Sequence, residues 1–253
     1  MELVVITASA GTFPGLAEAL RSLQLVAEEH PLIDFKAPAD WSPLDLALDR
    51  LSTYETIALT SPRAALTVAD RIAQRGKPPW ARDALPTVWA GGSATAAALR
   101  GTLGSVRVPA TLPVASAGAA ADLATAMIEA GIAGPVLFPC GNNRREELPG
   151  RLRREGIVVD EVVCYDSVLA TEPAAQAAAA GATVLVVASP SVAHLLTRVC
   201  PRESRPDLIA VGPTTAASAT ASGWAPAAVA SRPTAEAVIA AVRTVLASRA
   251  PHE

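Results

Sequence analysis

Short apolar runs alternate with longer amphipathic stretches along almost the whole chain. Most of the short runs are continuously apolar, which is typical of strands that helices cover on both faces. Strands are predicted at residues 3–6, 56–60, 87–90, 106–109, 135–138, 157–165, 182–188, 208–211 and 227–230. Helices are predicted near residues 14–24, 64–75, 93–101, 118–130, 144–155, 191–199, 214–222 and 233–248, and several of them end in glycine. This alternation predicts an α/β protein with parallel sheets.

The second half of the chain weakly repeats the first. A strand, a hydroxyl residue, a proline and a helix occur in each half, and so does a strand followed by a glycine turn and a helix. The paired segments are Thr60-Ser61-Pro62 with Ser189-Pro190, Gly91-Gly92-Ser93 with Gly212-Pro213-Thr214-Thr215, and Ser116 with Pro233-Thr234. We therefore predict two similar three-layer α/β/α domains.

Two stretches, near residues 34–38 and 166–173, are candidate crossings between these domains. If both are linkers, residues 37–167 form one domain, and residues 1–36 together with 168–253 form a discontinuous second one. Two extended linker strands would make a hinge, with an active-site cleft between the lobes.

Composition excludes several classes of function. The chain is 51% apolar and 18% charged, which favours packed cores over disorder. A net charge of −3 gives no basic face for nucleic acid. Its three cysteines are widely spaced and form no metal or redox motif, and no apolar stretch approaches the ~20 residues of a membrane span. We expect a cytoplasmic protein that binds neither nucleic acid nor membrane.

The most suggestive chemistry lies where a strand ends, a hydroxyl residue follows and a helix begins. Helix starts expose unpaired amides and partial positive charge, so they receive anions, and in open α/β sheets they gather at the carboxyl ends of the strands. Glycines at two of these turns would let the backbone approach a ligand closely. The hydroxyls also suit simple capping, the commoner role for any one of them, but two facing sets favour a ligand with several carboxylates or phosphates. The N-cap candidates are Ser61, Ser93, Ser189 and Thr214.

Other catalytic patterns are absent from the sequence. It holds no dinucleotide fingerprint, P-loop or nucleophile elbow, and its three histidines lack ligand spacing, so we expect no metal and no cofactor. The arginines at 144, 145, 151, 153 and 154 alternate with glutamates, which favours a solvated helix face. Tyr165, one of two tyrosines, ends the run Val162-Val163-Cys164 at the expected hinge. Such a tyrosine is usually a packing residue, but a phenol can donate a proton to a departing hydroxyl.

An ordered set of motifs closely resembles the uroporphyrinogen-III synthase family over nearly the whole chain. The set comprises Leu137-Phe138-Pro139-Cys140-Gly141-Asn142-Asn143-Arg144-Arg145-Glu146-Glu147-Leu148-Pro149, Tyr165-Asp166-Ser167-Val168, Thr60-Ser61 with Ala64, Ser189, and Gly212-Pro213-Thr214-Thr215-Ala216 with Gly223. Two positions depart from the family pattern. Many members have an arginine after the first strand, where this chain reads Thr7-Ala8-Ser9, and Cys140-Gly141 replaces an Arg-Gly pair.

The resemblance implies two α/β domains and a cofactor-independent lyase of porphyrin (haem) biosynthesis. Its substrate would be hydroxymethylbilane, which loses water and closes to uroporphyrinogen III with its last pyrrole ring inverted. Tyr165 matches the position that assists hydroxide departure. The implied substrate-binding residues are Thr60, Ser61, Gly91, Gly92, Ser93, Gly141, Asn142, Ser189, Pro190, Gly212, Pro213, Thr214 and Thr215. We also expect a monomer that contacts hydroxymethylbilane synthase transiently.

Two other interpretations stay open at this point. A non-catalytic two-lobed binder of a small polyanion would have the same outline, although the N-terminus lacks the basic start of an export signal. A transferase acting on a phosphorylated substrate is the other, but we expect it to need a phosphate loop and a basic residue at a helix start, and we predict neither in this chain.

Overall fold

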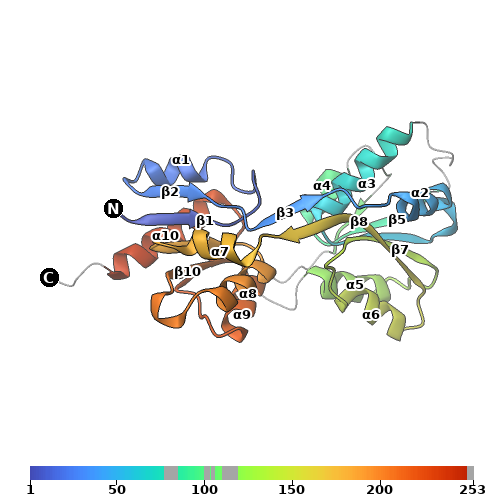
Figure 1. The fold of residues 1–253 in the computed structure, drawn as a ribbon. Helices are drawn as coiled ribbons and strands as arrows, with labels where there is room; N and C mark the ends of the chain where they lie inside the picture. The colour runs from blue at the N-terminus through green and yellow to red at the C-terminus, as the bar shows by residue number, and fades with distance from the viewer. Residues whose placement is uncertain (77–84, 100–102, 104–105, 110–118, 250–253) are drawn as a thin grey trace. The chain divides into compact units, whose positions relative to one another are not determined.

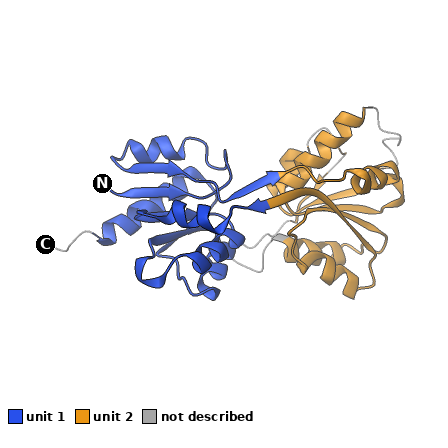
Figure 2. Ribbon diagram, in the orientation of Figure 1, with its two compact units in different colours: residues 1–35, 168–253 blue, residues 36–167 orange. Residues whose placement is uncertain are grey.

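The computed structural model describes residues 1–76, 85–99, 103, 106–109 and 119–249. Its contacts divide the chain into two compact units. Unit 1 comprises Met1–Phe35 and Val168–Glu253, and unit 2 comprises Lys36–Ser167 (Figure 2). Lys36, which the expected boundary assigned to the discontinuous domain, belongs to unit 2 in this division.

Unit 1 contains a five-stranded sheet of order β11-β10-β9-β1-β2, and its neighbouring strands are parallel. Helices α1 (Leu16–Arg21) and α10 (Ala235–Arg249) cover one face (Figure 1). The other face carries α7 (Glu172–Ala179), α8 (Pro190–Val199) and α9 (Pro213–Ala221). The strands are β1 (Leu3–Ile6), β2 (Val26–Glu29), β9 (Val184–Val187), β10 (Asp207–Val211) and β11 (Ala228–Ala230).

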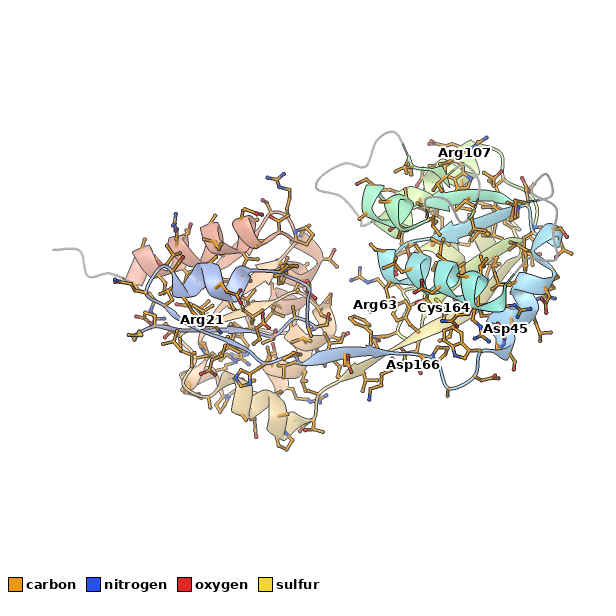
Figure 3. The ribbon with its side chains drawn as sticks, turned by 90° about the horizontal axis from the view of Figure 1, so that it is seen from above. Arg21, Asp45, Arg63, Arg107, Cys164 and Asp166 are labelled. Atoms are coloured by element: carbon orange, nitrogen blue, oxygen red, sulfur yellow. The ribbon has the colours of Figure 1, made fainter. Side chains whose placement is uncertain are left out.

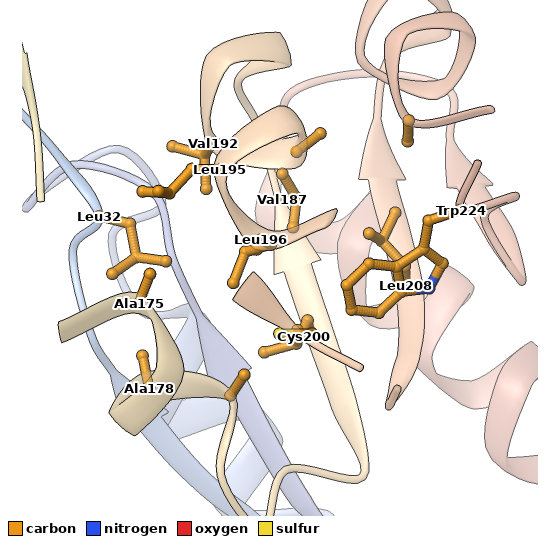
Figure 4. Close-up of a cluster of buried hydrophobic side chains, with 14 of the residues drawn as sticks. Leu32, Ala175, Ala178, Val187, Val192, Leu195, Leu196, Cys200, Leu208 and Trp224 are labelled. Atoms are coloured by element: carbon orange, nitrogen blue, oxygen red, sulfur yellow. The ribbon is translucent and has the colours of Figure 1, made fainter. Parts of the chain in front are cut away.

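Burial on both faces explains why the central strands are continuously apolar. In β1, Val5 points into the cluster with α7, α8 and α9, while Val4 and Ile6 point into the cluster with α1 and α10. Successive strand residues alternate between faces, so a strand covered on both sides needs an apolar residue at each position. Figure 4 shows the first cluster, in which Leu196 lies among the side chains from α7, β9 and β10.

Unit 2 contains a six-stranded sheet of order β3-β8-β7-β4-β5-β6. The pairings from β8 to β6 are parallel. Helices α2 (Ser42–Asp49), α3 (Pro62–Arg75) and α4 (Ser93–Ala98) cover one face, and α5 (Ala119–Glu129) and α6 (Glu147–Arg154) the other (Figure 1). The strands are β3 (Ile33–Lys36), β4 (Thr56–Leu59), β5 (Thr87–Ala90), β6 (Val106–Arg107), β7 (Val136–Gly141) and β8 (Val159–Leu169). Short 3-10 turns lie at Leu51–Thr53 in unit 2 and Arg202–Ser204 in unit 1.

The chain passes between the units twice, along β3 and along β8. These strands are neighbours in the sheet, and just beyond them the Ala170 N–H donates to the carbonyl of Leu32 at 2.9 Å. Both crossing points fall inside the stretches expected as linkers. The predicted fold class, an α/β protein with two parallel sheets covered by helices, is confirmed.

Several elements were missing from the sequence prediction. The strand β2 was missed because its Glu28 and Glu29 are exposed at the sheet edge. The helix α7 was taken for the end of a linker because of Pro173, but a proline in the first turn is compatible with a helix. The strand β3 and the helix α2 were also missed, and the helix expected from residue 144 begins at Glu147. Ser116, part of the expected repeat, lies outside the described residues.

In the part of the chain that the structure describes, no helix has both the length and the apolarity needed to cross a membrane.

Candidate active site

Each sheet reverses its strand order once, and ligands of open α/β sheets bind at the carboxyl ends of the strands beside such a reversal. In unit 2 the reversal lies between β4 and β7, which are followed by Thr60-Ser61 and by Asn142. In unit 1 it lies between β1 and β9, which are followed by Thr7 and by Ala188-Ser189. Each unit therefore has its own candidate binding edge.

Ser61 is the N-cap of α3, as the sequence predicts. Its backbone is extended, and its hydroxyl oxygen accepts a hydrogen bond from the Ala64 N–H at 3.0 Å. That arrangement satisfies one of the unpaired amides of the helix start. The Ser61 hydroxyl also lies 3.4 Å from the phenol oxygen of Tyr165, which comes from β8. Two residues 104 positions apart are thus brought together beside the strand-order reversal.

The ring of Tyr165 rests on the backbone of Gly141. The register between β7 and β8 shifts at Cys140/Gly141, and this irregularity pairs Gly141 with Tyr165. A Cβ added at Gly141 would lie 2.6 Å from Cε2, 2.7 Å from Cζ and 2.9 Å from the phenol oxygen of Tyr165. Contacts that short do not occur, so the position requires glycine for space.

Burial sets the protonation state of the groups around this ring. It raises the pKa of Tyr165 above its ordinary value, and the Ser61 hydroxyl and the charge of Arg63 only partly offset that increase. Burial also raises the pKa of Cys140 to about 11 and of Cys164 to about 12. At neutral pH the phenol keeps its proton and the two thiols are unreactive.

Asn142, which follows β7, bonds with β8 through backbone and side chain. Its N–H donates to the Tyr165 carbonyl at 3.1 Å. Its Oδ1 accepts from both the N–H and the hydroxyl of Ser167, each at 2.9 Å. The side-chain oxygen of Asn142, one of the implied substrate-binding residues, is therefore bonded to Ser167.

Two of the remaining capping predictions need correction, and the third is confirmed in position only. Ser93 and Thr214 lie inside the first turns of α4 and α9, whose N-caps are Gly92 and Gly212. Ser189 is the N-cap residue of α8, but its side chain makes no capping hydrogen bond. In α4 and α9 a glycine occupies the N-cap position, so each helix begins one or two residues earlier than the predicted hydroxyl cap would place it.

Two glycine amides are used within the sheets. The Gly91 N–H donates to the Leu59 carbonyl at 2.8 Å, and the Gly212 N–H donates to the Ala230 carbonyl at 2.9 Å. Gly212 has a φ of 83°, a conformation that favours glycine, and Thr215 after it is buried. The turns at Gly91-Gly92 and Gly212-Pro213 lie at the carboxyl ends of β5 and β10, as predicted, but these two amides are not directed at a ligand.

In unit 1, the binding edge is held by hydroxyls that bond to the backbone. The buried Thr7 donates its Oγ1 hydrogen to the Val186 carbonyl at 2.8 Å, joining β1 to β9. Ser218 of α9 donates to the Pro190 carbonyl at 3.5 Å, and Ser189 and Pro190 begin α8. Thr7 is therefore a structural residue in this chain.

Arg63 is the residue that sequence reasoning missed. It is the second residue of α3, directly after Ser61 and Pro62, and it is exposed. Figure 3 labels it at the start of this helix, together with Cys164 and Asp166, the residues on either side of Tyr165 in β8. A basic residue in the first turn of a helix that follows a buried strand is the sequence signal from which an anion site could have been predicted.

Three of the arginines near α6, Arg144, Arg145 and Arg153, form ion pairs with glutamates. Arg153 binds the Glu161 carboxylate at 2.6 Å, and Arg144 binds the same carboxylate through its Nε. Among the described residues, no group of three histidine, cysteine or acidic side chains is arranged to hold a metal ion.

The fold and site define a class: a two-unit α/β protein of doubly wound type that presents helix starts, hydroxyls and a protonated phenol at its strand ends. Such edges suit an anionic ligand that needs proton transfer.

Comparison with known proteins gives the family. Residues 15–240 match the family model described as uroporphyrinogen-III synthase HemD. The chain belongs to the uroporphyrinogen-III synthase family and is an enzyme of that kind, and nothing in the comparisons supports the non-catalytic binder.

Solved structures show the same fold at low identity. A mutant uroporphyrinogen III synthase from the extremely thermophilic bacterium Thermus thermophilus matches with a TM-score of 0.72 and 13% identity, covering 98% of this chain and 100% of that one. Uroporphyrinogen-III synthetase from Helicobacter pylori matches with a TM-score of 0.63 and 17% identity, also covering 98% and 100%. A search of curated proteins finds no match.

Proposed function

We propose that this chain binds hydroxymethylbilane and converts it to uroporphyrinogen III, with Tyr165 as the general acid. One observation supports the assignment of Tyr165 as the general acid. The Tyr165 phenol is kept protonated by burial and lies beside the capped start of α3, at the strand-order reversal of unit 2. Among the described residues near that reversal, the thiols of Cys140 and Cys164 are buried and their pKa values are raised, so neither competes as a proton donor.

The reaction begins with the loss of the terminal hydroxyl. The phenol gives its proton to that hydroxyl, which leaves as water, and the electron-rich pyrrole is left as a protonated azafulvene cation. The substituted carbon of the last pyrrole then attacks to give a spiro-pyrrolenine, which fragments and recloses with that ring reversed. The final carbon loses a proton as the pyrrole regains aromaticity, and that proton restores the phenol.

Ser61 and Arg63 assist the phenol after it has lost its proton. The oxygen of Ser61 accepts from Ala64, so its hydroxyl hydrogen can be donated to the phenolate oxygen, 3.4 Å away. The positive charge of Arg63 lowers the pKa of Tyr165, which means that it stabilises the phenolate. These contacts reduce the energy of the charge that develops during hydroxide loss.

The rest of the proposed catalysis consists of holding the substrate in one orientation, because the substrate is a flexible polycarboxylate. Holding reacting groups in one geometry can contribute up to about 7–11 kcal/mol. We propose that strand ends and helix starts of this chain hold the substrate. The set comprises Thr60, Ser61, Arg63, Gly91, Gly92, Ser93 and Gly141 in unit 2, and Ser189, Pro190, Gly212, Pro213, Thr214 and Thr215 in unit 1. Asn142 is left out because Ser167 occupies its side-chain oxygen.

We further propose that the enzyme acts as a cytoplasmic monomer with transient access to hydroxymethylbilane synthase. Hydroxymethylbilane also cyclises spontaneously to the unrearranged isomer. A short transfer from the producing enzyme would therefore limit that side reaction.

The test is an isomer-resolved assay. Hydroxymethylbilane is generated enzymatically, incubated with the purified chain, and the uroporphyrinogen isomers are separated after oxidation. We expect mainly the type III isomer. Only type I, the spontaneous product, would overturn the proposed activity and favour a polyanion binder.

A further inference from the structure

The contact between Asn142 and Ser167 continues the ladder between β7 and β8 after β7 has ended. The strand β7 stops at Gly141, and β8 runs on to Leu169. The Asn142 N–H donates to the Tyr165 carbonyl, and two residues further along β8 the Asn142 side chain meets Ser167. Residues two apart in a strand present their backbone groups on the same side, so both contacts fall on one edge of β8.

The side-chain amide of Asn142 imitates the peptide group that a longer β7 would supply. Its Oδ1 accepts the Ser167 N–H at 2.9 Å, as a backbone carbonyl would, and its Nδ2 donates to the Ser167 carbonyl at 3.5 Å. The Ser167 hydroxyl adds a third bond to Oδ1 at 2.9 Å. Ser167 is also the last residue of unit 2 before the chain passes into unit 1.

We propose that Asn142 is a positioning residue that holds β8 on both sides of Asp166 and thereby fixes the Tyr165 ring over Gly141. This inference rests on the proposed acid role of Tyr165. The end of a strand opens easily when few bonds hold it. A loosened β8 would let the phenol turn away from Ser61 while the rest of unit 2 stayed folded.

Two substitutions separate positioning from substrate binding. Asn142→Leu removes the acceptor, and we expect it to lower kcat by at least about tenfold with KM within about threefold of wild type. Asn142→Asp keeps an oxygen for both Ser167 donors and adds a negative charge. If Asn142 positions β8, Asn142→Asp should recover most of the turnover lost in the leucine variant. If Asn142 binds substrate, Asn142→Asp should raise KM more than about tenfold, because the new charge repels the substrate carboxylates.

A second readout needs no substrate. The chain has only two tyrosines, so in a Tyr54→Phe background the ultraviolet titration reports Tyr165 alone. Its pKa is raised by burial, and we expect Asn142→Leu to shift it back toward the ordinary value while Asn142→Asp shifts it less. Circular dichroism verifies that each variant is folded. Ser167→Ala, which keeps the Ser167 N–H, should have a smaller effect than Asn142→Leu on both readouts.

The outcomes are distinct. If Asn142→Leu leaves both kcat and the Tyr165 titration unchanged, or if Asn142→Asp mainly raises KM, the positioning role is wrong. If even the wild-type chain forms no type III isomer, the proposed function fails, and the titration still decides whether Asn142 holds Tyr165.

Discussion

At the scale of single residues, the two tyrosines of this chain differ in their surroundings. Tyr54 donates its phenol hydrogen to the Asp160 carboxylate at 2.7 Å, within a network that includes Arg50. Tyr165 lies against a glycine backbone and a serine hydroxyl at the carboxyl end of the sheet. The first has a carboxylate partner that fixes it in the structure, and the second is the proposed proton donor.

Replacing Tyr165 tests this distinction. We expect Tyr165→Phe to lower kcat by about a hundredfold, the lower end of the usual contribution of a general acid. The ring stays, so the melting temperature should move by only a few degrees, as for other small changes. The matched control is Tyr54→Phe, which removes the bond to Asp160 and should reduce stability but not turnover. Equal turnover of Tyr165→Phe and wild type would remove Tyr165 from the mechanism.

The pH profile gives an independent check of the same residue. An acid acts in its protonated form, which is present below its pKa, and burial raises the pKa of Tyr165 above 10.0. Turnover should therefore hold through neutral pH and fall only as the pH rises through a value above 10.0. This alkaline fall in turnover should be absent from the residual activity of Tyr165→Phe. If it persists in that variant, it is caused by another titrating group.

At the scale of elements, the join between β7 and β8 depends on one glycine. Gly141→Ala would push its Cβ into the Tyr165 ring, so we expect at least about a tenfold loss of kcat with the phenol displaced. Gly150→Ala is the matched control. Gly150 lies in α6 with nothing near its missing Cβ, so alanine there should stabilise the helix by about 0.5–1 kcal/mol. A fully active Gly141→Ala enzyme would mean that the ring position is not critical.

The pairing of α2 with α3 is electrostatic at its exposed edge. Asp45 of α2 accepts from Arg71 of α3 at 2.7 and 2.5 Å and meets Arg75 at 2.9 Å. The Arg71 guanidinium hydrogen bond leads the effects that hold the pKa of Asp45 at about 2 instead of 3.8. Because this pKa is depressed, the stabilisation is complete above pH 3.8 and is lost as the pH falls through about 2.

Asp45→Asn should therefore reduce the free energy of unfolding at pH 7 by about 1 kcal/mol, since the pair is partly screened by solvent. Urea unfolding at pH 7 and near pH 2 measures the difference, which should shrink toward zero in acid. Asp49→Asn, at a more exposed partner of Arg75, is the control and should have the smaller effect. A difference that does not depend on pH would point to packing instead of charge.

At the scale of the whole molecule, each unit has its own buried clusters. The two clusters of unit 2 contain only residues between 41 and 165, and those of unit 1 lie outside that range. A fragment of residues 33–170, which includes β3 and all of β8, should fold by itself with a cooperative thermal transition. The fragment should form no type III isomer, because it lacks the proposed substrate-binding residues at the starts of α8 and α9. A broad transition would show that unit 2 depends on unit 1, and an active fragment would exclude unit 1 from the reaction.

The sequence predicted the central strands best. Strands such as 3–6 and 87–90 are buried on both faces, so their composition alone identifies them. The edge strand β2 has no such signal, and α7 was obscured by its first-turn proline. In the site, Ser61 was predicted with the correct capping role. Ser93 and Thr214 were misjudged because a glycine can cap a helix without leaving a side-chain signature.

The sequence by itself determined the alternation of strands and helices, the α/β class and, through its ordered motifs, the family. These properties are local, since they depend on which residues follow one another. Only the tertiary structure decided that Tyr165 meets Ser61 across 104 positions, that Gly141 makes room for the ring and that Asn142 bonds to Ser167. Those contacts arise from strand order and from one shift of register, which long-range packing fixes and no stretch of sequence records.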